Sequence, residues 1–588
     1  MSCGWPSLFR FCICSALLTG LFPQPVLGAE SYLPTNNPTY KTIFGVYDRV
    51  ARAFADQRRP PRLLVSAKPL ARPVTIEGGA VLPDRYAPLS AVSREEPVII
   101  VDQRLLEAVA PLGPNRDSAL ALILGHDLAH FYLRHRLGRE GLGFADHLRS
   151  PPGDGSPAGA DAAVRERVRT VAAVETEAEA DYYGGFYGFL AGYDTTVVAD
   201  QVFDLVYRRL NVTDLRGYPS LTERKQIMAD VGRRLGELSV QYETANRLLV
   251  VGRPLEAAKL LDRLATQVGA VEIYTNAGVA WAVAALAASP PGRFPYLYPF
   301  LHDRESRLAR AGVTSPAEQS KTQVAKHAST GPAENELWSE YLENAGRDLD
   351  KALALNPGNP LALVNRAVIC QMSGETETAL LLARRAELAA EDQLPVLSAV
   401  HLLRGIIQAV QGGSEAAARE FRQAALQGFG QGDRTLGILL TKNVEPPPRI
   451  APHAGGLLAV DGATLPTVRF LLAKPDLTLT LREADGEAVV IARQSFPASA
   501  RWTVSFQDRD RTERLMVAFH VTTPGYAGTI HGVRIGSNAA DLRRVFGSPT
   551  QIVPSRQGEY WLYEPDRVVF SMSREGIVEG WFLYGVYE

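Results

Sequence analysis

Cysteine is nearly absent from this chain, which has four in 588 residues. Cys3, Cys12 and Cys14 lie close to the N-terminus within or beside an apolar stretch, so Cys370 is the one cysteine in the remainder. A single cysteine cannot form an intrachain disulfide. The folded protein must therefore depend on its hydrophobic cores, and a chain of this length has enough residues for about three or four of them.

The chain also lacks a strong charge of either sign. It has 62 Lys and Arg residues against 64 Asp and Glu residues, which gives a formal net charge of -2. No long basic or acidic block interrupts this balance. Because proteins that bind nucleic acid neutralise phosphates with a basic patch, the composition gives no support for a nucleic-acid partner.

Long apolar runs are scarce, and the clearest one is N-terminal. Arg10 precedes the apolar residues 11–22, and small residues follow, with expected cleavage after Gly28 or Ala29. This order is typical of a secretory signal peptide. The run is shorter than the about 20 apolar residues of a spanning helix, and no later stretch looks long and apolar enough. We therefore expect residues 1–29 to be a signal peptide and the mature chain to be exported without a transmembrane span.

The most informative short motif is Gly-His-Asp-Leu-Ala-His at residues 125–130. It lies within residues 117–136, which are rich in Ala and Leu and contain no Pro, so we expect a helix there. His126 and His130 are four residues apart and project from one face of that helix. Two imidazoles at this spacing can supply two of the three protein ligands of a catalytic zinc, and the third must come from elsewhere.

A second segment, residues 174–194, could supply the third ligand. Its first half is acidic, with Glu177, Glu179 and Asp181, and its second half is aromatic and rich in small residues. We expect a helix that ends near Gly192. A carboxylate from it could complete a His, His, Glu site with one coordination position left for water.

These two motifs, in this order, resemble the zinc metallopeptidase family that includes the CaaX prenyl proteases, the HtpX-like proteases and the periplasmic BepA-like proteases. Residues 126–135 resemble the family's HExxHxxxxH helix, including the trailing His135, and residues 177–181 resemble its ExxAD motif. The resemblance covers residues 38–235. It implies a zincin-type α+β peptidase domain, which we expect over residues 30–237.

The resemblance also implies the roles of individual residues. One Zn²⁺ per chain would be bound by His126, His130 and Glu177. Asp181 would orient one of the two histidines. The strand expected at residues 97–101 would lie at a sheet edge beside the cleft, where an extended substrate could add to it.

Two departures from the family pattern concern catalysis. Asp127 stands where the family has a Glu that serves as general base toward the attacking water. Asp is one methylene shorter, and a misplacement of about 1 Å can cost on the order of 10²-fold in rate. Tyr218 stands where BepA-like members have a His, and could donate a hydrogen bond to an oxyanion or simply anchor its loop. Neither residue is a ligand, so we expect zinc binding with reduced activity.

Several alternatives stay open. Two core histidines would explain His126 and His130, but not the acidic motif downstream. A His-Asp phosphohydrolase would need a metal-binding His upstream of His126, and the sequence has none. We interpret His135 as a cation near the C-terminal end of its helix rather than as a ligand. Residues 138–163, rich in Gly, Pro and Asp, are expected to form a loop that is either a lid or an insertion without a role.

From about residue 238 the sequence changes to pairs of helices with small residues at fixed positions. Three segments repeat the offsets of a tetratricopeptide repeat. These positions are Ala245, Gly252, Ala257 and Leu261, then Ala367, Gly374, Ala379 and Ala386, then Gly405, Gly412, Ala417, Phe421 and Ala424. We expect residues 238–440 to form about four degenerate repeats with an insertion near 288–335, or else a plain helical bundle. Stacked repeats would offer a concave surface to protein partners.

After the Pro-rich residues 445–453 the sequence becomes rich in β-branched and alternating runs. We expect a β-rich α+β domain over residues 441–588 that contacts protein partners. Within it we expect a strand followed by a short helix from near Asn538, and then an antiparallel meander. The chain is thus expected to be multidomain and mostly α-helical, with a β-rich C-terminal domain.

These features predict an exported, periplasmic, zinc-dependent metalloendopeptidase-like protein of a Gram-negative envelope. Its substrates would be envelope proteins, unfolded proteins or peptides. The alternatives are a catalytically inactive zinc-binding scaffold that binds proteins through its helical repeats, and an adaptor without metal.

Overall fold

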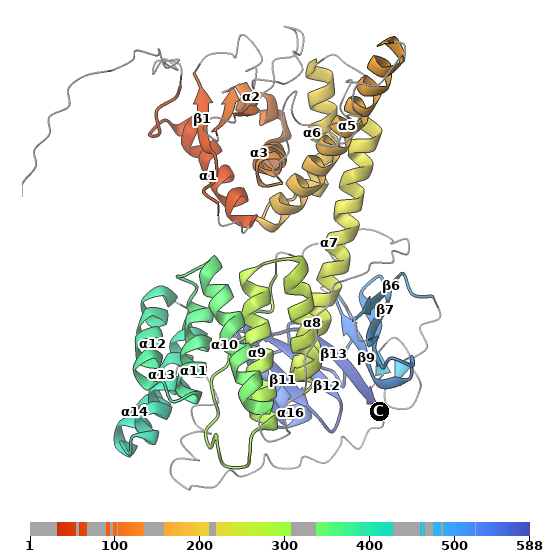
Figure 1. The fold of residues 1–588 in the computed structure, drawn as a ribbon. Helices are drawn as coiled ribbons and strands as arrows, with labels where there is room; N and C mark the ends of the chain where they lie inside the picture. Colours follow the sequence, from red (N-terminus) through yellow and green to blue (C-terminus); the bar gives the residue numbers. More distant parts are fainter. Residues whose placement is uncertain are drawn as a thin grey trace, which may run out of the picture.

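The computed structural model has an N-terminal part and a C-terminal part that are joined by one long helix, α7 (Figure 1). The residues it describes are 32–54, 58–67, 90–93, 98–102, 104–133, 158–210, 219–306, 308, 337–391, 393–426, 459–460, 463–464, 474–483, 486–523 and 525–588. The predicted signal peptide, His135 and Tyr218 lie outside the described residues.

The N-terminal part combines helices with a small sheet (Figure 1). Its helices are α1 (Pro38–Ala53), α2 (Arg104–Val109), the 3-10 helix η2 (Ala110–Asn115), α3 (Arg116–Tyr132), α5 (Ala158–Leu190) and α6 (Thr195–Leu210). Its strands are β1 (Arg62–Ser66), β2 (Ser90–Ser93) and β3 (Val98–Asp102).

The strand predicted at residues 97–101 is not at the edge of this sheet. It corresponds to β3, which lies between β1, its parallel neighbour, and β2, its antiparallel neighbour. Ile99 and Val101 are fully buried. The prediction of an edge strand is therefore wrong, because a continuous β-branched run is typical of a strand with neighbours on both sides. The strand that lies beside α3 is β2, and within the described residues it pairs with β3 alone.

Part of the segment predicted as a loop is helical. α5 begins at Ala158, so residues 158–163 belong to it, whereas residues 138–157 lie outside the described residues. Four of these six helical residues are alanine, the strongest helix former, and they outweigh the one Gly and one Asp.

α7 (Leu221–Val250) contacts α5 and α6 in the N-terminal part and α8 and α9 in the C-terminal part. It begins with a capping box, in which Ser220 and Glu223 bind each other's backbone N–H with their side chains. Its 30 residues extend over about 45 Å. The expected domain boundary at residue 237 falls inside this continuous helix.

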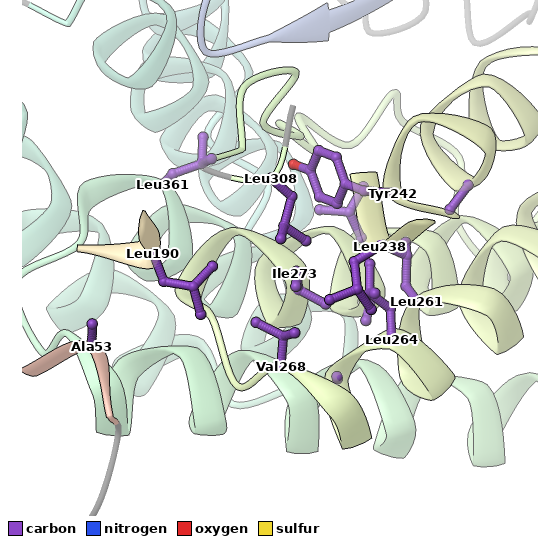
Figure 2. Close-up of a cluster of buried hydrophobic side chains, with 14 of the residues drawn as sticks. Ala53, Leu190, Leu238, Tyr242, Leu261, Leu264, Val268, Ile273, Leu308 and Leu361 are labelled. Atoms are coloured by element: carbon purple, nitrogen blue, oxygen red, sulfur yellow. The ribbon is translucent and has the colours of Figure 1, made fainter. Parts of the chain in front are cut away.

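The helices that follow α7 form a stack in which each helix packs against the next. They are α8 (Pro254–Gln267), α9 (Val271–Ala288), α10 (Leu337–Leu355), α11 (Pro360–Met372), α12 (Thr376–Ala390), α13 (Leu394–Val410) and α14 (Ser414–Leu426). Figure 2 shows part of their core, with side chains from α7, α8 and α9 that include Leu238, Tyr242, Leu261, Leu264 and Ile273.

The small residues singled out in the sequence occupy two kinds of position in this stack. Gly252, Gly374 and Gly412 have φ values of +78°, +85° and +85° at the turns between helices, where a side chain would be strained. A Cβ on Gly405 would overlap the ring of Phe421 on the next helix. The pattern therefore marks close pairs of helices and the turns that join them.

α9 corrects the expectation that no later stretch could cross a membrane. Residues Val271–Ala288 are long and apolar enough by length and composition. The helix nevertheless packs between α8 and α10, and a Cβ on Gly278 would lie 2.6 Å from Leu349 of α10. Its apolar sequence is that of a helix buried on most sides within the stack.

The C-terminal part is built on one antiparallel sheet in the order β10-β11-β12-β13-β9-β8-β7-β6. Its strands are β6 (Leu477–Arg482), β7 (Ala488–Phe496), β8 (Ser499–Gln507), β9 (Glu513–Thr522), β10 (Gln551–Ser555), β11 (Gly558–Tyr563), β12 (Val568–Ser573) and β13 (Val578–Tyr587). The expected mostly helical chain with a β-rich C-terminal region is confirmed. A separate two-stranded ribbon joins β4 (Ala459–Val460) and β5 (Ala463–Thr464).

The short helix expected from near Asn538 is α16 (Ala539–Phe546), and Asn538 caps it by accepting from the N–H of Asp541. The prediction of a strand immediately before this helix is wrong. The chain there forms a single bridge between Ile530 and Val533, since Gly532 has a φ of +84° that turns the backbone.

Candidate metal centre

The site lies where α3 and α5 cross at very short range. A Cβ on Gly125 would lie 2.6 Å from the carbonyl oxygen of Gly184, and a Cβ on Gly188 would lie 3.4 Å from that of Ala121. Residue numbers therefore rise along one helix as they fall along the other, so the two helices are antiparallel. Only glycine at this crossing allows the backbones to approach so closely.

This crossing places the two sequence motifs against each other. His126 and His130 extend from α3 one turn apart, and Glu177 and Asp181 extend from α5 one turn apart. The antiparallel arrangement sets His126 beside Asp181 and both histidines beside Glu177. The side chain of His130 is 5% exposed and that of Glu177 is 13% exposed.

Two imidazole nitrogens and the carboxylate of Glu177 converge in this arrangement. Nε2 of His126 lies 3.1 Å from Nε2 of His130 and 3.2 Å from Oε2 of Glu177. Nε2 of His130 lies 3.5 Å from Oε1 of Glu177. These three residues form a cluster that could hold a metal ion.

These distances fit the chemistry of zinc. Zinc binds imidazole nitrogen and carboxylate oxygen at about 2.0–2.2 Å in tetrahedral sites, so neighbouring ligand atoms lie about 3.3 Å apart. The observed separations of 3.1, 3.2 and 3.5 Å lie around that value, and each of the two histidines is nearest to a different oxygen of Glu177. Three ligands leave the fourth position of a tetrahedron for water or substrate.

Asp181 controls the orientation of His126. Its Oδ1 lies 2.8 Å from Nδ1 of His126, and the residue is 2% exposed. When Nδ1 carries the proton and donates a hydrogen bond to this carboxylate, the lone pair of Nε2 points toward His130 and Glu177. This is the tautomer that a metal ion requires.

No family model matches this chain, and a search of curated proteins finds no match. The metal centre therefore rests on the geometry of its own residues.

Arg224, from the first turn of α7, also belongs to the site. Its side chain is 11% exposed, and its nitrogens lie 3.2 Å from Oδ2 of Asp181 and 3.6 Å from Oε2 of Glu177. Sequence reasoning singled out Tyr218 in the same segment and missed this arginine. The signal in the sequence was an arginine four residues after Ser220, the residue that caps α7.

Charge pairing governs protonation in the metal-free site. Burial disfavours a charged imidazole, but the hydrogen bonds that His126 donates to Asp181 and Glu177 outweigh it and raise the pKa of His126 to about 10. Burial raises the pKa of Glu177, and hydrogen bonds to His126 and His130 overcome this effect and hold that pKa well below its usual range. A metal ion must therefore displace a proton from His126, so metal binding should strengthen as the pH rises.

Asp127 follows His126 in α3 and is 7% exposed. It is therefore a buried acidic residue next to a candidate ligand. The other expected catalytic residue, Tyr218, lies outside the described residues, as does the trailing His135.

Proposed function

We propose that this chain is an exported zinc metalloendopeptidase-like protein of the periplasm that acts on envelope or unfolded proteins. One observation carries the proposal. Two imidazole nitrogens from α3 and a carboxylate from α5 converge at separations that suit a single zinc ion.

Each residue of the site would have its own part. His126, His130 and Glu177 would hold the zinc, Asp181 would fix the tautomer of His126, and Arg224 would keep both carboxylates in place. Zinc in such a site supplies Lewis acidity toward a peptide carbonyl and lowers the pKa of a water molecule. Asp127 would accept the proton of that water and pass it to the leaving amine.

The strand β2 is the part of the sheet that could hold substrate. It lies beside α3 and, among the described strands, pairs on one side with β3. An extended peptide could add to its other edge through backbone hydrogen bonds, which would give broad specificity. In this proposal, residues 90–93 rather than residues 97–101 form the strand that binds an extended substrate.

An inactive zinc-binding scaffold is the second candidate, and Asp127 favours it. A carboxylate one methylene shorter than Glu must reach the same proton from a buried helical position. In that case the zinc would stabilise the crossing of α3 and α5, and the helical stack would bind protein partners. An adaptor without metal is the third.

Metal content tests the site. The purified full chain should contain about one zinc, as catalytic zinc sites with three protein ligands do, and His126→Ala should remove it. His401→Ala is the matched control, because His401 pairs with Glu420 between α13 and α14, away from the site. If the wild-type protein contains no zinc and takes up none when zinc is added, the adaptor without metal is the remaining candidate.

Cleavage of casein separates the enzyme from the scaffold. We expect slow cleavage by the wild type, faster cleavage by Asp127→Glu and none by His126→Ala. If the wild type and Asp127→Glu both contain zinc and neither cleaves casein, the protein is a scaffold.

A further inference from the structure

An extended segment between α9 and α10, residues 300–304, lies between the helical stack and the C-terminal sheet. Leu301 and His302 are 0% and 1% exposed, and Asp303 is 6% exposed. The segment belongs to no helix or named strand. Buried backbone groups require hydrogen-bond partners, and here the partners come from both sides.

On the helical side, two fully buried asparagines bind the backbone of alternate residues. Asn365 of α11 accepts from the N–H of Leu301 at 2.9 Å and donates to its carbonyl at 2.6 Å. Asn276 of α9 accepts from the N–H of Asp303 and donates to its carbonyl, both at 2.8 Å. A carboxamide offers both a donor and an acceptor. Each asparagine therefore makes the two hydrogen bonds that a residue of a neighbouring strand would make.

On the sheet side, the intervening residue binds the end of β10. The N–H of Arg556 donates to the carbonyl of His302 at 3.0 Å, and Nδ1 of His302 lies 3.0 Å from the carbonyl of Pro554. A parallel bridge pairs His302 with Ser555. The carboxylate of Asp303 lies 3.3 Å from the guanidinium of Arg556.

The two asparagines occupy equivalent places in the stack. Asn276 precedes Gly278 by two residues, and Asn365 precedes Ala367 by two residues, each a small residue buried in its helix pair. α9 and α11 are in contact although α10 lies between them in the stack, so the two carboxamides come from helices that touch each other. The backbone-binding groups thus repeat with the helices themselves.

We propose that α9 and α11, with β10 opposite them, form a binding slot for an extended polypeptide, and that residues 300–304 fill it as an intramolecular ligand which an external peptide can replace. The asparagines contact backbone atoms, so they accept any extended segment. The buried position of Leu301 selects an apolar side chain, and Arg556 selects a carboxylate two residues later. The partner is therefore an unfolded segment with an apolar residue followed, two positions on, by Asp or Glu.

The tether determines how readily such a partner binds. A segment that belongs to the same chain as its slot competes with an external peptide at an effective concentration on the order of millimolar. An external peptide binds only the fraction of molecules in which the slot is open, so its apparent Kd rises by the inverse of that fraction. Weakening the tethered segment should therefore tighten the binding of an external peptide. This inference is independent of the metal centre, and its test uses neither zinc nor cleavage.

The test measures fluorescence anisotropy of a labelled peptide with the sequence of residues 296–306, added to the full chain. The double variant Leu301→Ala/Asp303→Ala removes two of the buried side chains of the tethered segment and leaves the asparagines intact. We expect it to bind the peptide at least about tenfold more tightly than the wild type. The matched control, Leu381→Ala/Glu377→Ala on the exposed face of α12, should bind as the wild type does.

Two changes test the backbone contacts. In the weakened chain, Asn365→Asp keeps the side-chain shape but replaces the donor to the carbonyl by an acceptor, and should cost about tenfold or more in affinity. A peptide methylated on the nitrogen of the residue equivalent to Leu301 should lose a similar factor. Equal affinity for wild type and weakened chain, or no binding to either at millimolar peptide with helical circular dichroism intact, would overturn the proposal and make residues 300–304 a permanent strut.

A measurement on the wild type covers the case in which the double variant fails to fold. Hydrogen exchange should be slow at the amides of Leu301 and Asp303, and millimolar unlabelled peptide should accelerate it there while α11 stays protected. Unchanged exchange at these two amides would contradict the proposal independently of any variant.

Discussion

A Cβ atom built on Gly184 would overlap the backbone nitrogen of His126, because α5 and α3 touch there backbone to backbone. Asp181 and Glu177 lie about one and two turns away from Gly184 on the same helix. The spacing between the histidines and the carboxylates is therefore set by how closely these two backbones approach.

Gly184→Ala should separate the helices and damage the site. We expect a loss of about 1–3 kcal/mol in the free energy of unfolding from overpacking, and weaker zinc binding because the ligands from α5 move away. Thermal unfolding and a zinc titration would measure both. Gly232→Ala in α7 is the control, since its Cβ would meet one methyl group at 3.9 Å. That substitution should leave stability unchanged or raise it by up to about 1 kcal/mol. Equal behaviour of the two variants would show that the crossing is not tight.

Asp181→Asn should weaken zinc binding without removing a ligand. The amide can no longer act as a charged acceptor for Nδ1 of His126, so the tautomer that directs Nε2 toward the ligand cluster is less favoured. We expect zinc affinity to fall by about 10–100-fold while the stoichiometry remains the same. Competition with a chromogenic chelator would measure it. A larger fall, equal to that of His126→Ala, would mean that Asp181 is itself a ligand.

Arg224→Met should destabilise the metal-free protein more than the zinc-loaded protein. It removes the guanidinium from two buried carboxylates, a loss that typically costs about 3–5 kcal/mol. Bound zinc would supply positive charge to Glu177 in its place. The rise in melting temperature on adding zinc should therefore be larger for this variant than for the wild type.

Arg233→Met is the control for that experiment, because Arg233 lies on the same helix and pairs with Asp230 at the surface. Exposed pairs contribute about 0–1 kcal/mol, so this variant should resemble the wild type with and without zinc. If Arg224→Met responds to zinc as the control does, the guanidinium does not stabilise the carboxylates.

His302 should make the protein sensitive to acid. Burial, with the nearby charge of Arg304, lowers its pKa to about 3, although the carbonyl of Pro554 acts in the opposite direction. The unfolded chain binds this proton near pH 6.5 and the folded chain only near pH 3, so protons favour unfolding between these values. The stabilisation by neutral His302 is thus complete above pH 6.5 and is lost as the pH falls toward 3.

His302→Asn keeps a donor for the Pro554 carbonyl and cannot be protonated. Its free energy of unfolding, measured with urea from pH 7 to pH 4, should fall less steeply than that of the wild type, by a few kcal/mol over the range. His531→Asn, at an exposed histidine, should follow the wild-type curve. Parallel curves for all three proteins would show that His302 takes up no proton on unfolding.

Local features of this protein follow from short-range patterns in its sequence. The four-residue spacing puts His126 and His130 on one helical face, and the turns of the stack need glycine where φ is positive, as at Gly252. Helix periodicity and β-branched runs also predict a mostly helical chain with a β-rich end. These patterns can be recognised because each depends on residues within a few positions of one another.

The neighbours of these elements depend on the packing of the whole chain. A run of apolar residues predicts a strand at β3 but does not give its place in the sheet, which is central. Arg224 joins the site because α7 packs against α5, and residues 300–304 are buried because helices and sheet close on them from two sides. Such contacts join residues far apart in the chain, and the free energy that selects them is the burial and hydrogen bonding of both partners at once.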